Sequence, residues 1–65
     1  MRTLATVKDV MSFIKDSDSK WVTLITACSG IEVYNDFYMN FPNEMKELDV
    51  TMIEFQSGCI ILYVL

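Results

Sequence analysis

The last seven residues of the chain, CIILYVL (59–65), contain no charged side chain and no strongly polar one. Branched and aromatic residues favour an extended backbone, so this segment predicts a β-strand. At the edge of a sheet, such a strand would expose unpaired backbone groups beside apolar side chains and would promote aggregation. Segment 59–65 therefore has to lie inside a sheet, and this requirement constrains the fold more than any other feature.

The N-terminal part of the chain predicts an amphipathic helix. Thr6 is a good N-cap, and Asp9 places a negative charge in the first turn, where it is favoured. The Ser-Asp-Ser sequence at 17–19 ends the predicted helix. Apolar residues recur at the i, i+3, i+4, i+7 spacing of one helix face, and these are Val7, Val10, Met11 and Ile14.

Four further segments are rich in β-forming residues, and a Ser-Gly turn joins each pair of them: 20–27 with 31–39, and 50–56 with 59–65. Between the two pairs, Pro42 can open a short helical turn within 40–49. Met45 and Leu48 would pack the underside of this turn against the core. The predicted order of elements is therefore helix, strand, strand, short helix, strand, strand.

These elements predict one α+β domain over residues 1–65, with the N-terminal helix packed on a four-stranded antiparallel sheet. The apolar strands 20–27 and 59–65 belong in the centre of the sheet, and the two strands that carry acidic residues belong at its edges. With the strands numbered along the chain, this gives the spatial order 2-1-4-3, and segment 40–49 crosses between the edges. The alternative is a simple meander, which leaves strand 59–65 at an edge.

The charge balance argues against several classes of function. The chain of 65 residues has 9 acidic and 5 basic residues, no histidine, and a formal net charge of −4. Phosphate binding needs clustered Lys and Arg, so we expect no direct contact with nucleic acid. Without histidine or a glycine-rich phosphate loop, we expect a non-enzymatic protein that carries no cofactor. Two cysteines cannot form a common zinc site alone, so no metal site is predicted.

The longest apolar run, 59–65, is far shorter than the roughly 20 residues that span a bilayer. The first residues also lack the apolar core of a signal peptide. We therefore expect a cytoplasmic protein without a membrane contact, in which Cys28 and Cys59 are reduced thiols. In the predicted antiparallel sheet both cysteines lie at the same end, so a redox pair is the alternative interpretation.

Aromatic residues outside the predicted core are the features that most suggest binding. One helix covers only one face of the sheet, yet strand 59–65 offers apolar side chains to both faces. Alternation in strand 31–39 turns both of its tyrosines and both of its acids away from its main apolar set. Because interfaces are enriched in tyrosine, we predict a contact surface that includes Glu32, Tyr34, Asp36, Tyr38, Ile61 and Tyr63. Alternatively, the short helix and the chain ends cover this face within the monomer.

Four segments carry a resemblance to known proteins: TVKDVMSFIKD, WVTLITACSGIEVYNDFY, FPNEMKELDV and TMIEFQSGCIILYVL. With these four segments, the chain resembles short, mostly uncharacterised proteins that are encoded by phages and prophages of low-GC Gram-positive bacteria. The resemblance covers nearly the full length and is one of overall pattern rather than of a diagnostic motif. Some small acidic phage proteins inhibit host defence systems, and anti-CRISPR proteins are among them.

The resemblance therefore implies a phage accessory protein that acts by binding, with inhibition of a bacterial host defence protein as the expected outcome. Because strand 59–65 is apolar on both faces, we also expect a homodimer or a larger assembly. One alternative is a structural homo-oligomer without an inhibitory role. Another is a protein that sequesters a small molecule, such as a nucleotide, in a pocket between subunits.

Overall fold

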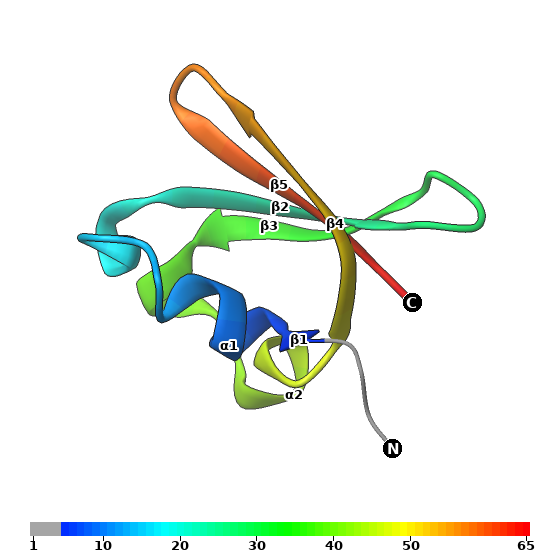
Figure 1. Cartoon of the computed structure of the whole chain (residues 1–65), viewed down its shortest axis with the longest axis horizontal. Coiled ribbons are helices and arrows are strands. Elements are labelled where there is room, and N and C mark those ends of the chain that lie inside the picture. The colour runs from blue at the N-terminus through cyan, green and yellow to red at the C-terminus, as the bar shows by residue number, and fades with distance from the viewer. Residues whose placement is uncertain (1–4) are drawn as a thin grey trace.

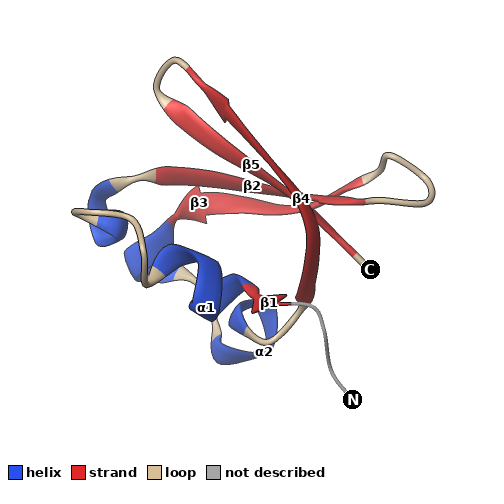
Figure 2. Ribbon diagram, viewed as in Figure 1, coloured by secondary structure: helices blue, strands red, loops and turns tan. Residues whose placement is uncertain are grey.

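The computed structural model of the protein describes residues 5–65, in which a five-stranded sheet curls over a layer of short helices (Figures 1 and 2). Figure 2 shows both α-helices on the same side of this sheet. The strands are β1 (Ala5–Thr6), β2 (Trp21–Thr26), β3 (Glu32–Phe37), β4 (Asp49–Gln56) and β5 (Cys59–Val64). The helices are α1 (Val7–Met11) and α2 (Asn43–Lys46), with 3₁₀ turns η1 (Ser17–Ser19) and η2 (Tyr38–Asn40).

Helix α1 begins at the predicted N-cap. The Thr6 hydroxyl accepts a hydrogen bond from the Asp9 backbone N–H at 3.2 Å, and the Asp9 carboxylate accepts one from the Thr6 N–H at 3.1 Å. This capping box satisfies two backbone donors that a helix start leaves unpaired. The helix ends at Met11, earlier than predicted, and Asp16 then adopts a left-handed backbone with a φ of 58° just before η1. Phe13 consequently lies 89% exposed.

The predicted fold class was wrong. The strands lie in the order β1-β4-β5-β2-β3, and the central pair, β2 and β5, is parallel, whereas each other pair of neighbours is antiparallel. The sheet is therefore mixed, five-stranded and curled as a half-barrel, rather than a four-stranded antiparallel sheet under an N-terminal helix. Strand β5 does lie inside the sheet, between β4 and β2, as its apolar sequence requires.

The route of the chain between β3 and β4 explains the parallel pair. Residues 38–48 run along the sheet on its helical side, so β4 starts at the opposite end from the one where β3 stops (Figure 1). Tyr38 and Phe41 are buried in the core, and Met45 and Leu48 pack against it. The packing of Met45 and Leu48 confirms the prediction, whereas the burial of Tyr38 and Phe41, which also holds this return path in place, was not predicted. The fifth strand, β1, is added where the backbone N–H of Val7 donates to the Leu48 carbonyl at 2.9 Å.

The core lies between the sheet and the helical layer. Its buried residues come from the central strands and from the segments that cover them: Val7, Met11, Val22, Leu24, Tyr38, Phe41, Val50, Ile60, Leu62 and Val64. Alternate residues of β5 are buried, which gives this strand one core face and one opposite face. The turn into β5 depends on Gly58, whose φ of 82° is a conformation that side chains disfavour. None of the helices within residues 5–65 is long and apolar enough to cross a membrane.

Candidate interaction surface

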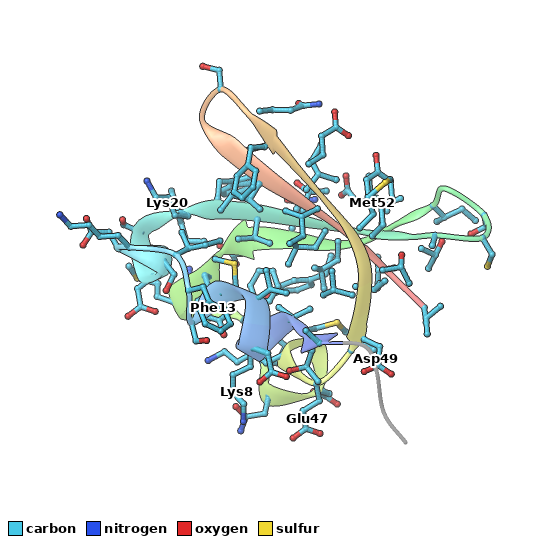
Figure 3. The ribbon with its side chains drawn as sticks, in the orientation of Figure 1. Lys8, Phe13, Lys20, Glu47, Asp49 and Met52 are labelled. Atoms are coloured by element: carbon cyan, nitrogen blue, oxygen red, sulfur yellow. The ribbon has the colours of Figure 1, made fainter. Side chains whose placement is uncertain are left out.

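The side of the sheet that faces away from the helices carries a second set of apolar residues. Leu24 and Leu62 face the core, so alternation turns their neighbours Ile25, Ile61 and Tyr63 to the opposite side. Residues that are paired with these three on neighbouring strands lie on the same side of the sheet. We call this surface the outer face, and it consists of Trp21, Thr23, Ile25, Asn35, Phe37, Met52, Glu54, Ile61 and Tyr63. Figure 3 shows Met52 projecting on the side away from α1.

An aromatic pair forms the most prominent part of the outer face. The rings of Trp21 and Phe37 meet edge to face, with centroids 5.1 Å apart and planes at 86°. Both remain accessible, with 36% of Trp21 and 43% of Phe37 exposed. An edge-to-face pair fixes both rings in place and so presents a rigid apolar surface. The sequence interpretation missed this pair, although Trp21 alternates with the buried Val22 and Leu24 and could have been assigned to the opposite face.

Ile61 and Tyr63, which were predicted to belong to a contact surface, lie on the outer face, and both are half-buried. Glu54 lies on the same face, and its carboxylate is hydrogen-bonded by two side chains. Gln56 Nε2 and Tyr63 Oη each donate a hydrogen bond of 3.0 Å to its carboxylate. These two hydrogen bonds, that of Gln56 first, lower the pKa of Glu54, and the bond to Glu54 raises the pKa of Tyr63. The outer face thus carries a carboxylate that is hydrogen-bonded to two neighbouring side chains.

The predicted outward orientation of Tyr34 and Tyr38 was wrong. The pairing of β3 with β2 sets Tyr34 opposite the buried Leu24 and Asp36 opposite the buried Val22, so the same alternation carries Tyr38 to the core side, where it is only 7% exposed. Its ring lies 5.6 Å from that of Phe41, and burial, followed by the charge of Asp18, raises its pKa. Tyr34 is opposite the buried Leu24 and meets Phe41 edge to face at 4.9 Å.

Correspondingly, the residues that were expected on the buried face of this strand lie at the surface. These are Ile31, Val33, Phe37 and Met39.

The two acids of β3 face opposite sides of the sheet. Glu32 is paired with Ile25 and accepts a hydrogen bond from Asn35 Nδ2, so it lies at the rim of the outer face. Asp36 is paired with the buried Val22 and is half-buried. The structure therefore brings Glu32, Ile61 and Tyr63 to one face and leaves Tyr34, Tyr38 and Asp36 on the other.

A groove of about 580 Å³ opens at the end of the sheet where β2 and β5 begin. Ile14, Phe55, Ile60 and the aromatic pair give it apolar walls. Lys15 and Lys20 also line the groove, whereas no Asp or Glu among residues 5–65 does. Figure 3 shows Lys20 at this end of the molecule. A chain of net charge −4 therefore holds a locally positive, apolar groove beside its outer face.

The two cysteines do not form a pair. Cys59 begins β5 and lies level with Trp21, whereas Cys28 follows the far end of β2, because these strands are parallel. At about 3.3 Å per residue, the five positions from Trp21 to Thr26 already separate the two thiols by about 15 Å. A disulfide requires Cα atoms within about 7 Å, so the expectation that both lie at one end was wrong and an intramolecular redox pair is excluded. No group of three or more His, Cys, Asp or Glu side chains within residues 5–65 could hold a metal ion.

Comparison of the sequence with protein-family models gives no match. Comparisons with curated proteins and with solved structures give no significant match either.

Proposed function

We propose that this protein is a non-enzymatic binding domain that contacts another protein through its outer face. The observation that carries this proposal is the aromatic pair of Trp21 and Phe37, held rigidly on a side of the sheet that the described helices do not cover. Ile25, Met52, Ile61 and Tyr63 extend the same apolar surface across all four long strands.

The composition of the outer face supports this role. The buried centres of protein interfaces are enriched in Trp, Tyr, Phe and Met and depleted of Lys, Asp and Glu. The outer face has all four enriched types, and its charged residues are Glu54 and, at the rim, Glu32. A sheet surface is rigid before binding, so little conformational entropy is lost when a partner docks. The net charge of −4 favours a partner with a basic rim, because complementary charge speeds association.

The resemblance to phage accessory proteins supplies the class of partner. On that basis the partner is a bacterial host protein in the cytoplasm, and binding inhibits it. The acids at the rim of the outer face, such as Glu32, would steer this encounter.

Trp21→Ala is expected to weaken partner binding by about 2 kcal/mol or more, which is about 30-fold in Kd, because buried aromatic anchors dominate interface energies. The measurement is capture of a stoichiometric partner by the immobilised protein, followed by calorimetric titration of that purified partner. Phe13→Ala is the matched control, since Phe13 is exposed outside the outer face. A partner lost with Phe13→Ala but retained at full affinity by a folded Trp21→Ala variant would contradict the proposal.

A second candidate function is supported by the groove, and it is binding of a small organic anion that has a flat apolar body. The groove volume falls within the range of ligand pockets, about 300–1,000 Å³. Its two lysines supply positive charge for a phosphate or carboxylate, and its aromatic walls supply a stacking surface. This groove lies within one chain, whereas the sequence interpretation placed a pocket between subunits.

Adenosine monophosphate is expected to quench the fluorescence of Trp21, the single tryptophan of the chain, with saturation. Adenosine and inorganic phosphate should each bind at least about tenfold more weakly, because each lacks one half of the recognised chemistry. Lys20→Gln should weaken the binding, whereas Lys46→Gln, outside the groove, should leave it unchanged. Equal binding by adenosine and by the monophosphate would remove this second candidate.

A further inference from the structure

The groove and the outer face are continuous, because the aromatic pair belongs to both. The rings of Trp21 and Phe37 line the groove, and they also form the most prominent part of the outer face. Both rings are exposed to solvent. A protein that covers this pair therefore also reaches the groove.

The walls of the groove carry further apolar residues, which come from two separate segments. Ile14 lies between α1 and η1, whereas Phe55 and Ile60 come from the β4–β5 hairpin, which stands clear of the helical layer in Figure 1. Ile14 is half-buried, and Phe55 is 68% exposed. An apolar side chain inserted here would therefore remove from water a surface that the chain itself leaves accessible.

The charges of residues 14–20 are divided between two hollows. Lys15 and Lys20 line the groove, whereas Asp16 and Asp18 line a second, smaller hollow with Met39. Neither lysine forms an ion pair with another group of residues 5–65. The groove therefore holds two ammonium groups that are available to an anionic partner.

The exposure of the walls favours a segment of a protein over a free small molecule. Small-molecule sites bury about 70–90% of the ligand surface. Here the aromatic walls formed by Trp21, Phe37 and Phe55 remain 36%, 43% and 68% exposed, so they enclose a ligand poorly. A segment of a larger protein gains the missing burial, because the rest of that protein covers the outer face.

We infer that the groove receives an acidic, aromatic segment of the protein that binds the outer face, and this inference rests on the proposed binding function. An aromatic side chain of the segment packs against the aromatic pair and Phe55, and carboxylates next to it bind the Lys15 and Lys20 ammonium groups. The groove volume of about 580 Å³ is that of a site for a drug-sized ligand, which corresponds to a few residues of an extended chain. Charge complementarity selects an acidic segment, since a basic one would bring like charges together.

The groove and the outer face differ in charge, so the partner needs charges of both signs. Its acidic segment meets the lysines of the groove, whereas the basic rim that the net charge of −4 favours meets Glu32 and Glu54 on the outer face. A partner docked in the reverse orientation would place like charges side by side, which weakens binding. The two surfaces together therefore define one orientation of the partner.

The inference is tested by selection of short random peptides, displayed on phage, against the immobilised full chain. We expect enrichment of peptides that carry an aromatic residue beside Asp or Glu. The double variant Lys15→Gln with Lys20→Gln should still select aromatic residues but should lose the enrichment of acids, because both lysines of the groove are then replaced by neutral side chains. Enrichment of basic or uncharged peptides, or of none, by the unaltered chain would overturn the inference, as would acids that stay enriched with the double variant.

A selected peptide is then titrated, with the fluorescence of Trp21 as the readout. The double lysine variant should weaken its binding at least about fivefold at low salt and less at high salt, because exposed ion pairs are individually weak and are screened. The matched control is Lys8→Gln with Lys46→Gln, which removes the same charge outside the groove. Equal losses with the two double variants would show a response to net charge alone and overturn the inference.

Two further outcomes separate this inference from the proposed functions. A partner whose binding is weakened by Ile61→Ala, on the outer face outside the groove, but not by the double lysine substitution leaves the proposed protein binding intact and overturns the inference. Saturable binding of adenosine monophosphate without any selected peptide would assign the groove to a small molecule and overturn it as well. If no partner is captured but acidic aromatic peptides bind, the proposed role of the outer face fails, whereas the assignment of the groove is supported.

Discussion

Tyr38→Ala is expected to lower the free energy of unfolding by about 3–5 kcal/mol, as large aromatic truncations in a core do. The ring of Tyr38 is buried against Phe41, and the Lys46 ammonium group lies 5.0 Å from its centroid. A domain of this size has a stability near the lower end of the usual range of about 5–15 kcal/mol. The variant should therefore be largely unfolded, which urea denaturation followed by circular dichroism would show.

Two companion variants separate the role of the ring from that of its position. Tyr38→Phe keeps the buried ring and should retain most of the stability. Met39→Ala, at an exposed neighbouring position, should change the free energy of unfolding by about 0.5 kcal/mol or less. If Tyr38→Ala instead folds like the wild type and loses only partner binding, the ring belongs to a contact surface and its burial is refuted.

Leu62→Ala is expected to cost about 2–5 kcal/mol of stability, because Leu62 is fully buried at the centre of β5 and its truncation leaves a cavity. Its neighbour Ile61 points to the outer face, so Ile61→Ala should cost much less. Thermal and urea unfolding of both variants provide the measurement. The comparison tests which face of the central strand is the core, and a larger loss for Ile61→Ala than for Leu62→Ala would reverse the assignment.

The same pair of variants separates folding from binding. Ile61→Ala removes apolar area from the outer face without emptying the core, so it should weaken partner binding more than it weakens the fold. Leu62→Ala should weaken the fold more than it weakens partner binding by the folded protein.

Features that depend on neighbouring residues could be predicted from the sequence. Thr6 and Asp9 form the expected capping box because both partners lie within one turn of the helix. The turns at Gly30 and Gly58 have the positive φ that glycine allows. Four of the five strands lie in segments with the predicted β-forming composition, and the apolar segment 59–65 is internal because an exposed edge would be unstable. Local composition and periodicity are sufficient for each of these.

Other features depend on contacts between distant segments, and only the tertiary structure decided them. Burial of Tyr38 and Phe41 holds the link beneath the sheet, and this route makes β2 and β5 parallel and separates Cys28 from Cys59. The pairing of β3 with β2 sets Tyr34 opposite the buried Leu24 and Phe37 opposite Trp21, and this decides on which faces the aromatic residues of β3 lie. A strand has the same period of two whether its neighbour is parallel or antiparallel, and whether it faces a core or solvent. The sequence by itself therefore determined the four long strands and the start of α1, whereas strand β1, the direction of pairing and the outer face came from long-range packing.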